Sequence, residues 1–370
     1  MTLLTPFPLV KRYALLGHCE GAALLAEADA RIASDPAAQR LLARPGARVT
    51  SDLQTRLREG RLRIKSVLWT VQVPQRPSPG LAARSLSVAP DAAQWFNLED
   101  DPALPFGQML RQPETHVLRY VPGRRATLRL LRDGLPIIQK IKKKERLAEA
   151  RSRHLLVEAA VENASLPIPG MLMPGTDYCL RCCPGVPMEA ATTTADRLAE
   201  LGRIVARLHG CAMPGLPPAD LPEDPLPWLA TALPGLAARW QHLGEALAGE
   251  AHRPDALCHG DLCLSQVLLH QDGTADHLTL LDFDRAGAGS AAADLATLLC
   301  SLPDLGPDRH FAAEAAVLEG YSSIRAVPSG LGAACARAEM DLLRHHIRKG
   351  TAPTRQIMAG LSRAEAALVA

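Results

Sequence analysis

Between Cys258 and Leu295 the chain brings together two acidic centres and one amide. The first centre is His259-Gly260-Asp261, and Gln266 follows Asp261 five residues later. An apolar run from Leu278 to Leu281 then leads into the second centre, Asp282-Phe283-Asp284. These are oxygen-bearing side chains at short, fixed spacing, which is the type of residue that binds metals and moves protons.

This pattern suits phosphoryl transfer. That reaction needs a metal to neutralise phosphate charge, a group that takes or orients the proton of the attacking hydroxyl, and a fixed in-line geometry. Asp261 can meet an acceptor hydroxyl with its carboxylate. Gln266 and Asp282 offer hard oxygen atoms, which Mg²⁺ prefers as ligands together with phosphate and water oxygens. The spacing therefore predicts one base and two metal ligands.

Two short strands must position these groups. The apolar residues before Asp282 favour a strand, and Asp272-Gly273 favours a tight turn that joins it to the strand before. Carboxylates at the ends of two paired strands lie a few ångströms apart. We therefore expect both acidic centres to form one site.

A second arrangement of strands lies further towards the N-terminus. Pro122-Gly123 suits a type II turn, because Pro presets the first φ and Gly accepts the positive second one. Asp133-Gly134 marks another turn. The pattern predicts three strands in a meander and then a long amphipathic helix, at Thr115 to Val121, Arg124 to Leu131, Leu135 to Lys142 and Lys143 to Asn163.

The flanking regions carry clear periodicities. Residues 1 to about 60 have apolar positions at helical spacing, and Pro74 to Gly80 is typical of a loop. Leu62 to Val73 alternates as a strand does, with these side chains expected inside: Leu62, Ile64, Val67, Trp69 and Val71. The segment from Arg197 to Gly210 predicts a core helix after a cap at Thr192 to Asp196. From Ala291 onward the chain is expected to be almost wholly helical.

Composition excludes several classes of protein. The chain has 370 residues, of which 47% are hydrophobic and 22% charged, so it is long enough for two folded domains. A net charge of +2 gives no support for a nucleic-acid or membrane partner. Lys11 and Arg12 interrupt the N-terminal apolar stretch, and no apolar run has the ~18 residues of a membrane span. We therefore expect a cytoplasmic protein. Its nine scattered cysteines fit reduced thiols better than disulfides or a zinc site.

These motifs together resemble the aminoglycoside phosphotransferase and choline kinase-like family. The resemblance rests on HGD with an amide five residues on, then an apolar strand, DFD, and DLA ten residues beyond the last Asp of DFD. The phrases LRYVPGRR and ELGRIVARLHG add to it, so that it covers roughly residues 90 to 350. It implies an α+β, two-lobed, protein-kinase-like fold. It also implies ATP, Mg²⁺ and transfer of a γ-phosphoryl group to a hydroxyl of a small molecule.

The resemblance implies a role for individual residues. Asp261 would be the catalytic base, Asp282 and Gln266 the Mg²⁺ ligands, and Lys140 the small-lobe lysine that touches the α- and β-phosphates. The helix partner of Lys140 would be Glu158, with Glu149 and Glu162 as alternatives. His259 and Asp294 would support the loop. Arg124 and Arg125, at the hairpin tip, could either reach the phosphates or be solvated.

The chain departs from the family pattern at two points. The second metal ligand is usually Asn, whereas here it is Gln266, and no glycine-rich loop lies between the first two strands of the meander, where Gly123 stands alone. An alternative is therefore a nucleotide-binding pseudokinase or scaffold. A protein kinase fits less well, because HGD replaces HRD and no APE segment appears. We expect three parts: a helical extension (1–60), a nucleotide-binding lobe (61–186) and a helical catalytic lobe (187–370).

Overall fold

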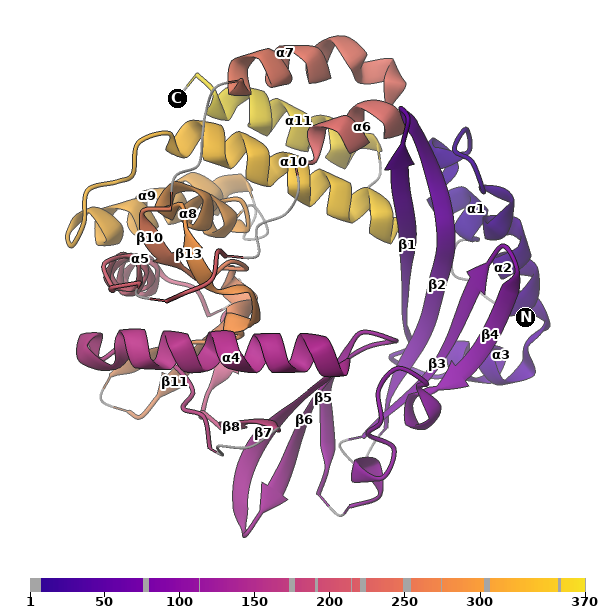
Figure 1. Cartoon of the computed structure of the whole chain (residues 1–370), viewed down its shortest axis with the longest axis horizontal. Helices are drawn as coiled ribbons and strands as arrows, with labels where there is room; N and C mark the ends of the chain where they lie inside the picture. Colours follow the sequence, from indigo (N-terminus) through magenta and orange to yellow (C-terminus); the bar gives the residue numbers. More distant parts are fainter. Residues whose placement is uncertain are drawn as a thin grey trace.

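The fold is α+β, as the sequence predicted (Figure 1). The structure is a computed structural model that describes residues 8–75, 80–112, 114–172, 177–189, 192–213, 215–219, 224–248, 254–273, 275–302, 307–351 and 354–369. Within these ranges, no helix has the combination of length and apolar character that crossing a membrane would require.

The N-terminal part begins with three helices and continues as a four-stranded antiparallel meander. The helices are α1 (Leu9–Arg12), α2 (Ala23–Ser34) and α3 (Pro36–Leu42), and the strands are β1 (Arg48–Arg58), β2 (Arg61–Gln75), β3 (Gly80–Ala89) and β4 (Ala92–Asn97). All five side chains predicted to be buried in β2 are buried. Of the predicted loop at Pro74 to Gly80, residues 76–79 lie outside the described residues.

The expectation of helix throughout residues 1 to 60 was wrong for β1. The strand does alternate, since Val49, Leu53 and Leu57 are covered on one side, but Ser51 and Thr55 stand between them, so its apolar residues recur only every four positions. Its conformation is imposed by pairing with β2 along its whole length. Residue 60 is the predicted boundary between the helical extension and the nucleotide-binding lobe. It lies in the turn between these two strands.

The N-terminal sheet shares a hydrophobic core with helices from the other end of the chain. These helices are α6 (Leu226–Ala232), α7 (Ala237–Leu247), α10 (Leu331–Lys349) and α11 (Thr354–Ala367). Side chains such as Ile64 and Trp69 belong to one buried cluster with Trp240, Met340 and Leu361. In Figure 1, α6, α7, α10 and α11 lie together at the top, beside the upper ends of β1 and β2.

A second four-stranded antiparallel sheet forms the predicted meander. It contains β5 (His116–Val121), β6 (Arg125–Arg132), β7 (Leu135–Lys142) and β8 (Tyr178–Arg181), in that order. Gly123 has a φ of +66°, as the type II turn requires, and Asp133 and Gly134 have φ values of +52° and +76°. The helix α4 (Lys144–Val161) follows β7, which confirms the prediction of a sheet that leads into a long helix.

The remaining elements carry the acidic motifs. Helix α5 (Ala195–His209) begins at Thr194, whose hydroxyl accepts a hydrogen bond from the backbone N–H of Arg197, as predicted. The short strands are β9 (Val186–Pro187), β10 (Ala256–Cys258), β11 (Val267–Gln271), β12 (Asp276–Leu280) and β13 (Gly287–Gly289), and the further helices are α8 (Ala291–Leu299) and α9 (Pro307–Ser322). Strands β11 and β12 pair around Asp272-Gly273, which confirms the predicted hairpin.

Candidate active site

The loop that carries Asp261 is anchored by Asp294. This carboxylate, in the first turn of α8, accepts hydrogen bonds of 2.8 Å from the backbone N–H groups of both His259 and Gly260. Its Oδ2 also lies 3.2 Å from Nε2 of His209. Burial would raise the pKa of Asp294, but these donors, His209 first, hold it below its usual value. A buried carboxylate with this many donors fixes the loop.

His259 fixes the backbone on both sides of the site. Its Nε2 lies 2.6 Å from the carbonyl oxygen of Leu281, and its Nδ1 accepts from the backbone N–H of Asp261 at 3.3 Å. An amide N–H only donates, so Nδ1 must be the unprotonated nitrogen and Nε2 the donor. The ring therefore ties the residue before Asp282 to Asp261, the supporting role expected for this histidine.

Asp261 projects from this loop beside one arginine. Nη1 of Arg285 lies 3.4 Å from Oδ1 of Asp261, whose side chain is 38% exposed. Desolvation raises the pKa of Asp261 above its usual value, although Arg285 and His259 oppose the shift. A carboxylate of raised pKa is a stronger proton acceptor when ionised, so this position suits a general base.

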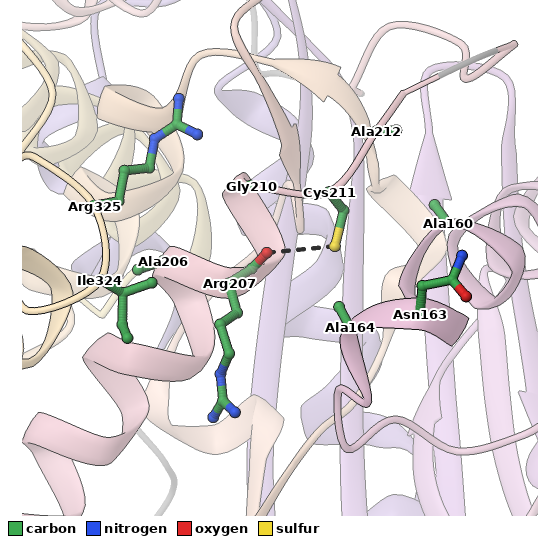
Figure 2. A pocket seen from close by; sticks show the side chains of 10 residues that line it. All are labelled: Ala160, Asn163, Ala164, Ala206, Arg207, Gly210, Cys211, Ala212, Ile324 and Arg325. Carbon is green, nitrogen blue, oxygen red and sulfur yellow. Dashed lines mark hydrogen bonds between the residues drawn. The ribbon is translucent and has the colours of Figure 1, made fainter.

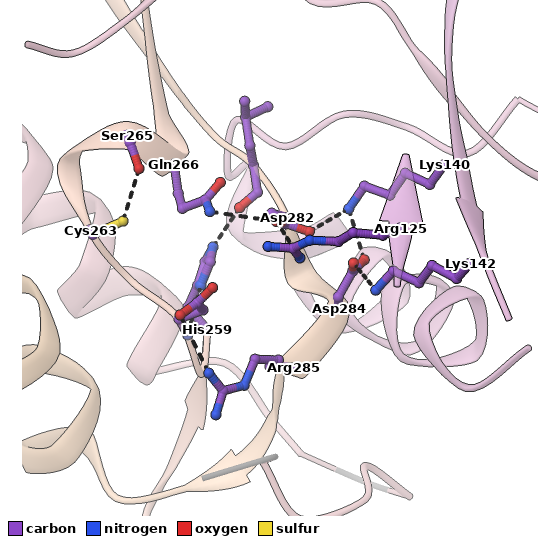
Figure 3. Close-up of polar contacts among 12 residues, drawn as sticks. Arg125, Lys140, Lys142, His259, Cys263, Ser265, Gln266, Asp282, Asp284 and Arg285 are labelled. Atoms are coloured by element: carbon purple, nitrogen blue, oxygen red, sulfur yellow. Dashed lines mark hydrogen bonds and ion pairs between the residues drawn. The ribbon is translucent and has the colours of Figure 1, made fainter. Parts of the chain in front are cut away.

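The strongest electrostatic feature joins the β5–β8 sheet to the second acidic centre (Figure 3). Nζ of Lys140, on β7, lies 2.6 Å from Oδ1 of Asp282 and 2.7 Å from Oδ1 of Asp284. Lys142 pairs with the other oxygen of Asp284, and Nη1 of Arg125 lies 3.6 Å from Oδ2 of Asp282. Three cations from one sheet therefore meet two carboxylates from the loop after β12.

Mutual attraction keeps these groups charged despite their burial. Desolvation alone would lower the pKa of Lys140, but Asp284 and Asp282 raise it above its usual value. Desolvation likewise opposes ionisation of Asp282, yet Lys140 holds the pKa of this carboxyl well below its usual range. Asp282 also has a φ of +66°, a conformation that costs a non-glycine residue ~1–3 kcal/mol and persists only where the surroundings fix it.

Gln266 lies beside Asp282, as the spacing predicted. Its side chain is 7% exposed, and its Nε2 is 3.5 Å from Oδ2 of Asp282. Rotation of the amide by 180° would instead present its oxygen next to that carboxylate. An amide oxygen and a carboxylate at this separation fit the oxygen ligands that Mg²⁺ prefers.

Two predicted cofactor-binding residues have other partners. The carboxylate of Glu158 accepts from the backbone N–H of Met171, with both oxygens at 3.2 Å, so Glu158 is not the partner of Lys140 as predicted. Asp282 and Asp284, from the loop after β12, take that role instead. Arg124 points to Asp52 on β1, at 3.4 Å, rather than to the acidic centre.

The sequence assigned no role to Lys142 or Arg285. It placed Asp284 in the second acidic centre without a role of its own, and it left open whether Arg125 reaches the phosphates or solvent. Two of these residues could have been predicted. Lys142 lies two residues after Lys140 and therefore shares its face of the strand. For Arg125 the signal was its cross-strand position opposite Lys142, which depends on the register of β6 and β7. Nothing in the local sequence around Arg285 indicates its contact with Asp261.

A separate pocket of about 490 Å³ lies elsewhere (Figure 2). Its lining includes Asn163, Arg207, Cys211, Ile324 and Arg325, and none of the predicted site residues. In Figure 2 the side chains of Arg207 and Arg325 point in different directions. This pocket is therefore not the place where the acidic motifs converge.

Comparison with known proteins identifies the family. The model of the phosphotransferase enzyme family matches residues 129–327. The chain belongs to this phosphotransferase family. The match spans Lys140, Asp261, Gln266 and Asp282, and it confirms the resemblance found in the sequence. No curated protein sequence matches the chain.

Several solved structures of phosphotransferases are similar in fold to this family member. An ethanolamine kinase from Plasmodium vivax has 12% identity and a TM-score of 0.45, covering 69% of this chain and 81% of its own. The aminoglycoside phosphotransferase APH(4)-Ia has 14% identity and a TM-score of 0.49, with 74% and 96% covered. A macrolide 2'-phosphotransferase from Brachybacterium faecium has 17% identity and a TM-score of 0.43, with 68% and 91% covered.

Proposed function

We propose that the protein transfers the γ-phosphoryl group of ATP to a hydroxyl group of a small molecule. The observation that carries this proposal is the position of Lys140, which is held within hydrogen-bonding distance of Asp282 and Asp284. A lysine from a sheet can hold the phosphates of a nucleotide directly, and carboxylates from a facing loop would hold them through a metal ion. Membership of a phosphotransferase family supports the same conclusion.

Asp261 acts as the general base in this proposal. Its carboxylate accepts the proton of the attacking hydroxyl as the oxygen bonds to phosphorus, and the phosphorus–oxygen bond to the leaving diphosphate breaks. Arg285 keeps the carboxylate oriented at 3.4 Å, and the loop itself is held by His259 and Asp294. Lys140 stabilises negative charge on the phosphates.

Asp282 and Gln266 would hold Mg²⁺. Their oxygen chemistry fits this ion, and Asp282 is held ionised by its cationic neighbours. When bound, the ion supplies positive charge that offsets the charge of the phosphates. In its absence Lys140 neutralises Asp282, so we expect Lys140 to turn towards the phosphates when the nucleotide binds.

The test is Mg²⁺-dependent consumption of ATP with a panel of amino alcohols, sugars and aminoglycosides, comparing wild type with Asp261→Ala. We expect one acceptor class to support turnover and the variant to lose roughly 10²–10⁴-fold of it, the usual contribution of a general base. The control is Asp196→Ala, an exposed residue in the first turn of α5, which should leave turnover unchanged.

Two outcomes would overturn the proposal. If wild type binds ATP but every acceptor gives no more turnover than Asp261→Ala does, the protein is a nucleotide-binding scaffold rather than a kinase. If wild type binds neither ATP nor GTP in the presence of Mg²⁺, the site does not bind nucleoside triphosphates at all.

A further inference from the structure

One face of the β5–β8 sheet carries a cluster of four cations: Arg119, Arg125, Lys140 and Lys142. Residues directly opposite one another on paired antiparallel strands project to the same face. Thr127 lies opposite both Arg119 on β5 and Lys140 on β7. Arg125 lies opposite Lys142, two residues along from Thr127 and Lys140. All four side chains therefore project to the face that meets Asp282 and Asp284.

The two lysines and the two arginines of this face differ in their burial and in how closely they pair with the acidic residues. Lys140 and Lys142 are nearly buried and pair closely with Asp282 and Asp284. Arg125 approaches Asp282 only to 3.6 Å and is 29% exposed. Arg119 is an exposed residue on the edge strand of this sheet.

Arg119 projects to the same face of the sheet as Lys140, whose Nζ contacts both carboxylates of the second acidic centre. The surrounding protein lowers the pKa of its guanidinium and nearby Arg125 lowers it further, whereas Asp282 and Asp261 act in the opposite direction. The charges of the predicted metal ligand, Asp282, and of the predicted base, Asp261, therefore both act on Arg119. In the proposed function, phosphoryl transfer takes place between those two carboxylates.

The hairpin tip between β5 and β6 cannot cradle phosphates with its backbone. In such a loop the N–H groups have to be directed at the ligand. Here Pro122 has no N–H, the N–H of Gly123 donates to Oδ2 of Asp101 at 2.7 Å, and the N–H of Arg124 donates to the carbonyl of Val121 at 3.1 Å. Positive charge for the phosphates must come from side chains instead.

We propose that Arg119 and Arg125 bind the terminal phosphates of the nucleotide, replacing a glycine-rich loop, and that Arg119 contacts the γ-phosphoryl group during transfer. This inference rests on the proposed function. A guanidinium can grip two phosphate oxygens at once, which an ammonium cannot. Both arginines precede residue 129, where the family match begins, so the assignment comes from the register and contacts of this chain.

The test is a series of nucleotides of different phosphate length, measured by calorimetry in the presence of Mg²⁺ and requiring no acceptor. We expect Arg119→Ala and Arg125→Ala each to weaken AMP-PNP binding by about tenfold or more, the size of a lost hydrogen bond between charged groups. Arg119→Ala should affect ADP much less, and AMP affinity should change in neither variant. Arg119→Lys should restore only part of the loss.

Arg129→Ala is the matched control, because Arg129 is exposed on the same strand and face as Arg125 but lies four residues from it. It should bind all three nucleotides as wild type does. Thermal unfolding of each variant reports whether it folds.

Equal losses for AMP-PNP, ADP and AMP, or no loss at all, in folded Arg119 and Arg125 variants would overturn this inference while leaving the proposed function intact. Failure of wild type to bind any of the nucleotides would overturn both.

Discussion

The two four-stranded sheets of this protein have the same antiparallel topology, but only the β5–β8 sheet has a face that carries the cations of the candidate site. The β1–β4 sheet buries Ile64, Trp69 and Leu86 in the core that it shares with the C-terminal helices. The β5–β8 sheet also has an apolar face, which includes Leu128 and Ile137. Its other face carries the four cations that meet the acidic loop. The strand order therefore does not determine the role of a sheet, and the side chains on one of its faces do.

The two sheets also differ in their relation to the family match. The match begins within β6 and ends before α10, so it contains neither β1–β4 nor the two final helices. Those segments, from opposite ends of the chain, pack into one hydrophobic cluster together with α6 and α7, which lie inside the match. The part of the protein outside the match therefore packs onto α6 and α7 through one shared core, and we expect it to contribute stability more than catalysis.

Removing a large side chain from the β1–β4 sheet should have the greatest effect on stability. Trp69 is 2% exposed and contacts Trp95 edge-on, with ring centroids 6.1 Å apart. We expect Trp69→Ala to lower the free energy of unfolding by roughly 3–5 kcal/mol, as for other buried aromatic truncations. Urea denaturation measures this loss, and Trp69→Phe should lose less. If the folded Trp69→Ala protein failed to bind Mg-ATP, the division of labour between the sheets would be wrong.

Removing the buried cation of the β5–β8 sheet should instead affect catalysis. We expect Lys140→Met to slow transfer to the best acceptor by roughly 10²–10³-fold, because one preorganised charge on the phosphates is lost. Lys65→Met, an exposed residue on β2, is the control from the other sheet and should behave as wild type. A Lys140→Met enzyme with unchanged steady-state rates would contradict the role assigned to this sheet.

The sequence predicted local elements better than long-range contacts. Local signals sufficed for the HGD and DFD motifs, the hairpin around Asp272-Gly273 and the position of Lys140 on a strand before a helix. The partners of Lys140 could not be predicted in the same way, because Asp282 lies 142 residues further along the chain. Glu158 was misassigned for the same reason, since its contact with Met171 depends on how the chain returns after α4.

The β1 strand shows the other limit of local patterns. Its apolar residues Val49, Leu53 and Leu57 recur every four positions, a spacing that fits a helix as well as a strand, and pairing with β2 decides the conformation. The contact of Arg124 with Asp52 follows from the placement of this strand beside the β5–β6 hairpin. Arg124 thus pairs with Asp52 on β1, whereas its neighbour Arg125 lies near Asp282. The sequence could not distinguish these two partners.

The pH dependence of the reaction should report the ionisation of Asp261, the proposed general base. A base works only when ionised, and the pKa of Asp261 is raised above its usual value. Activity should therefore be full at higher pH and fall by about tenfold per pH unit below that raised pKa, at a pH above the ~3.9 of an ordinary aspartate. A profile of kcat/KM against pH measures this. The residual activity of Asp261→Ala should lack this acidic limb, and its persistence there would assign the limb to another group.

The central claim is that the acidic loop facing Lys140 is a magnesium–nucleotide site, and the affinity of the protein for ATP with and without Mg²⁺ tests it most directly. We predict that Mg²⁺ strengthens ATP binding to wild type and to the exposed control Asp276→Asn, whereas Asp282→Asn loses this dependence. ATP affinity that does not respond to Mg²⁺ in wild type, or that responds equally in Asp282→Asn, would contradict the account.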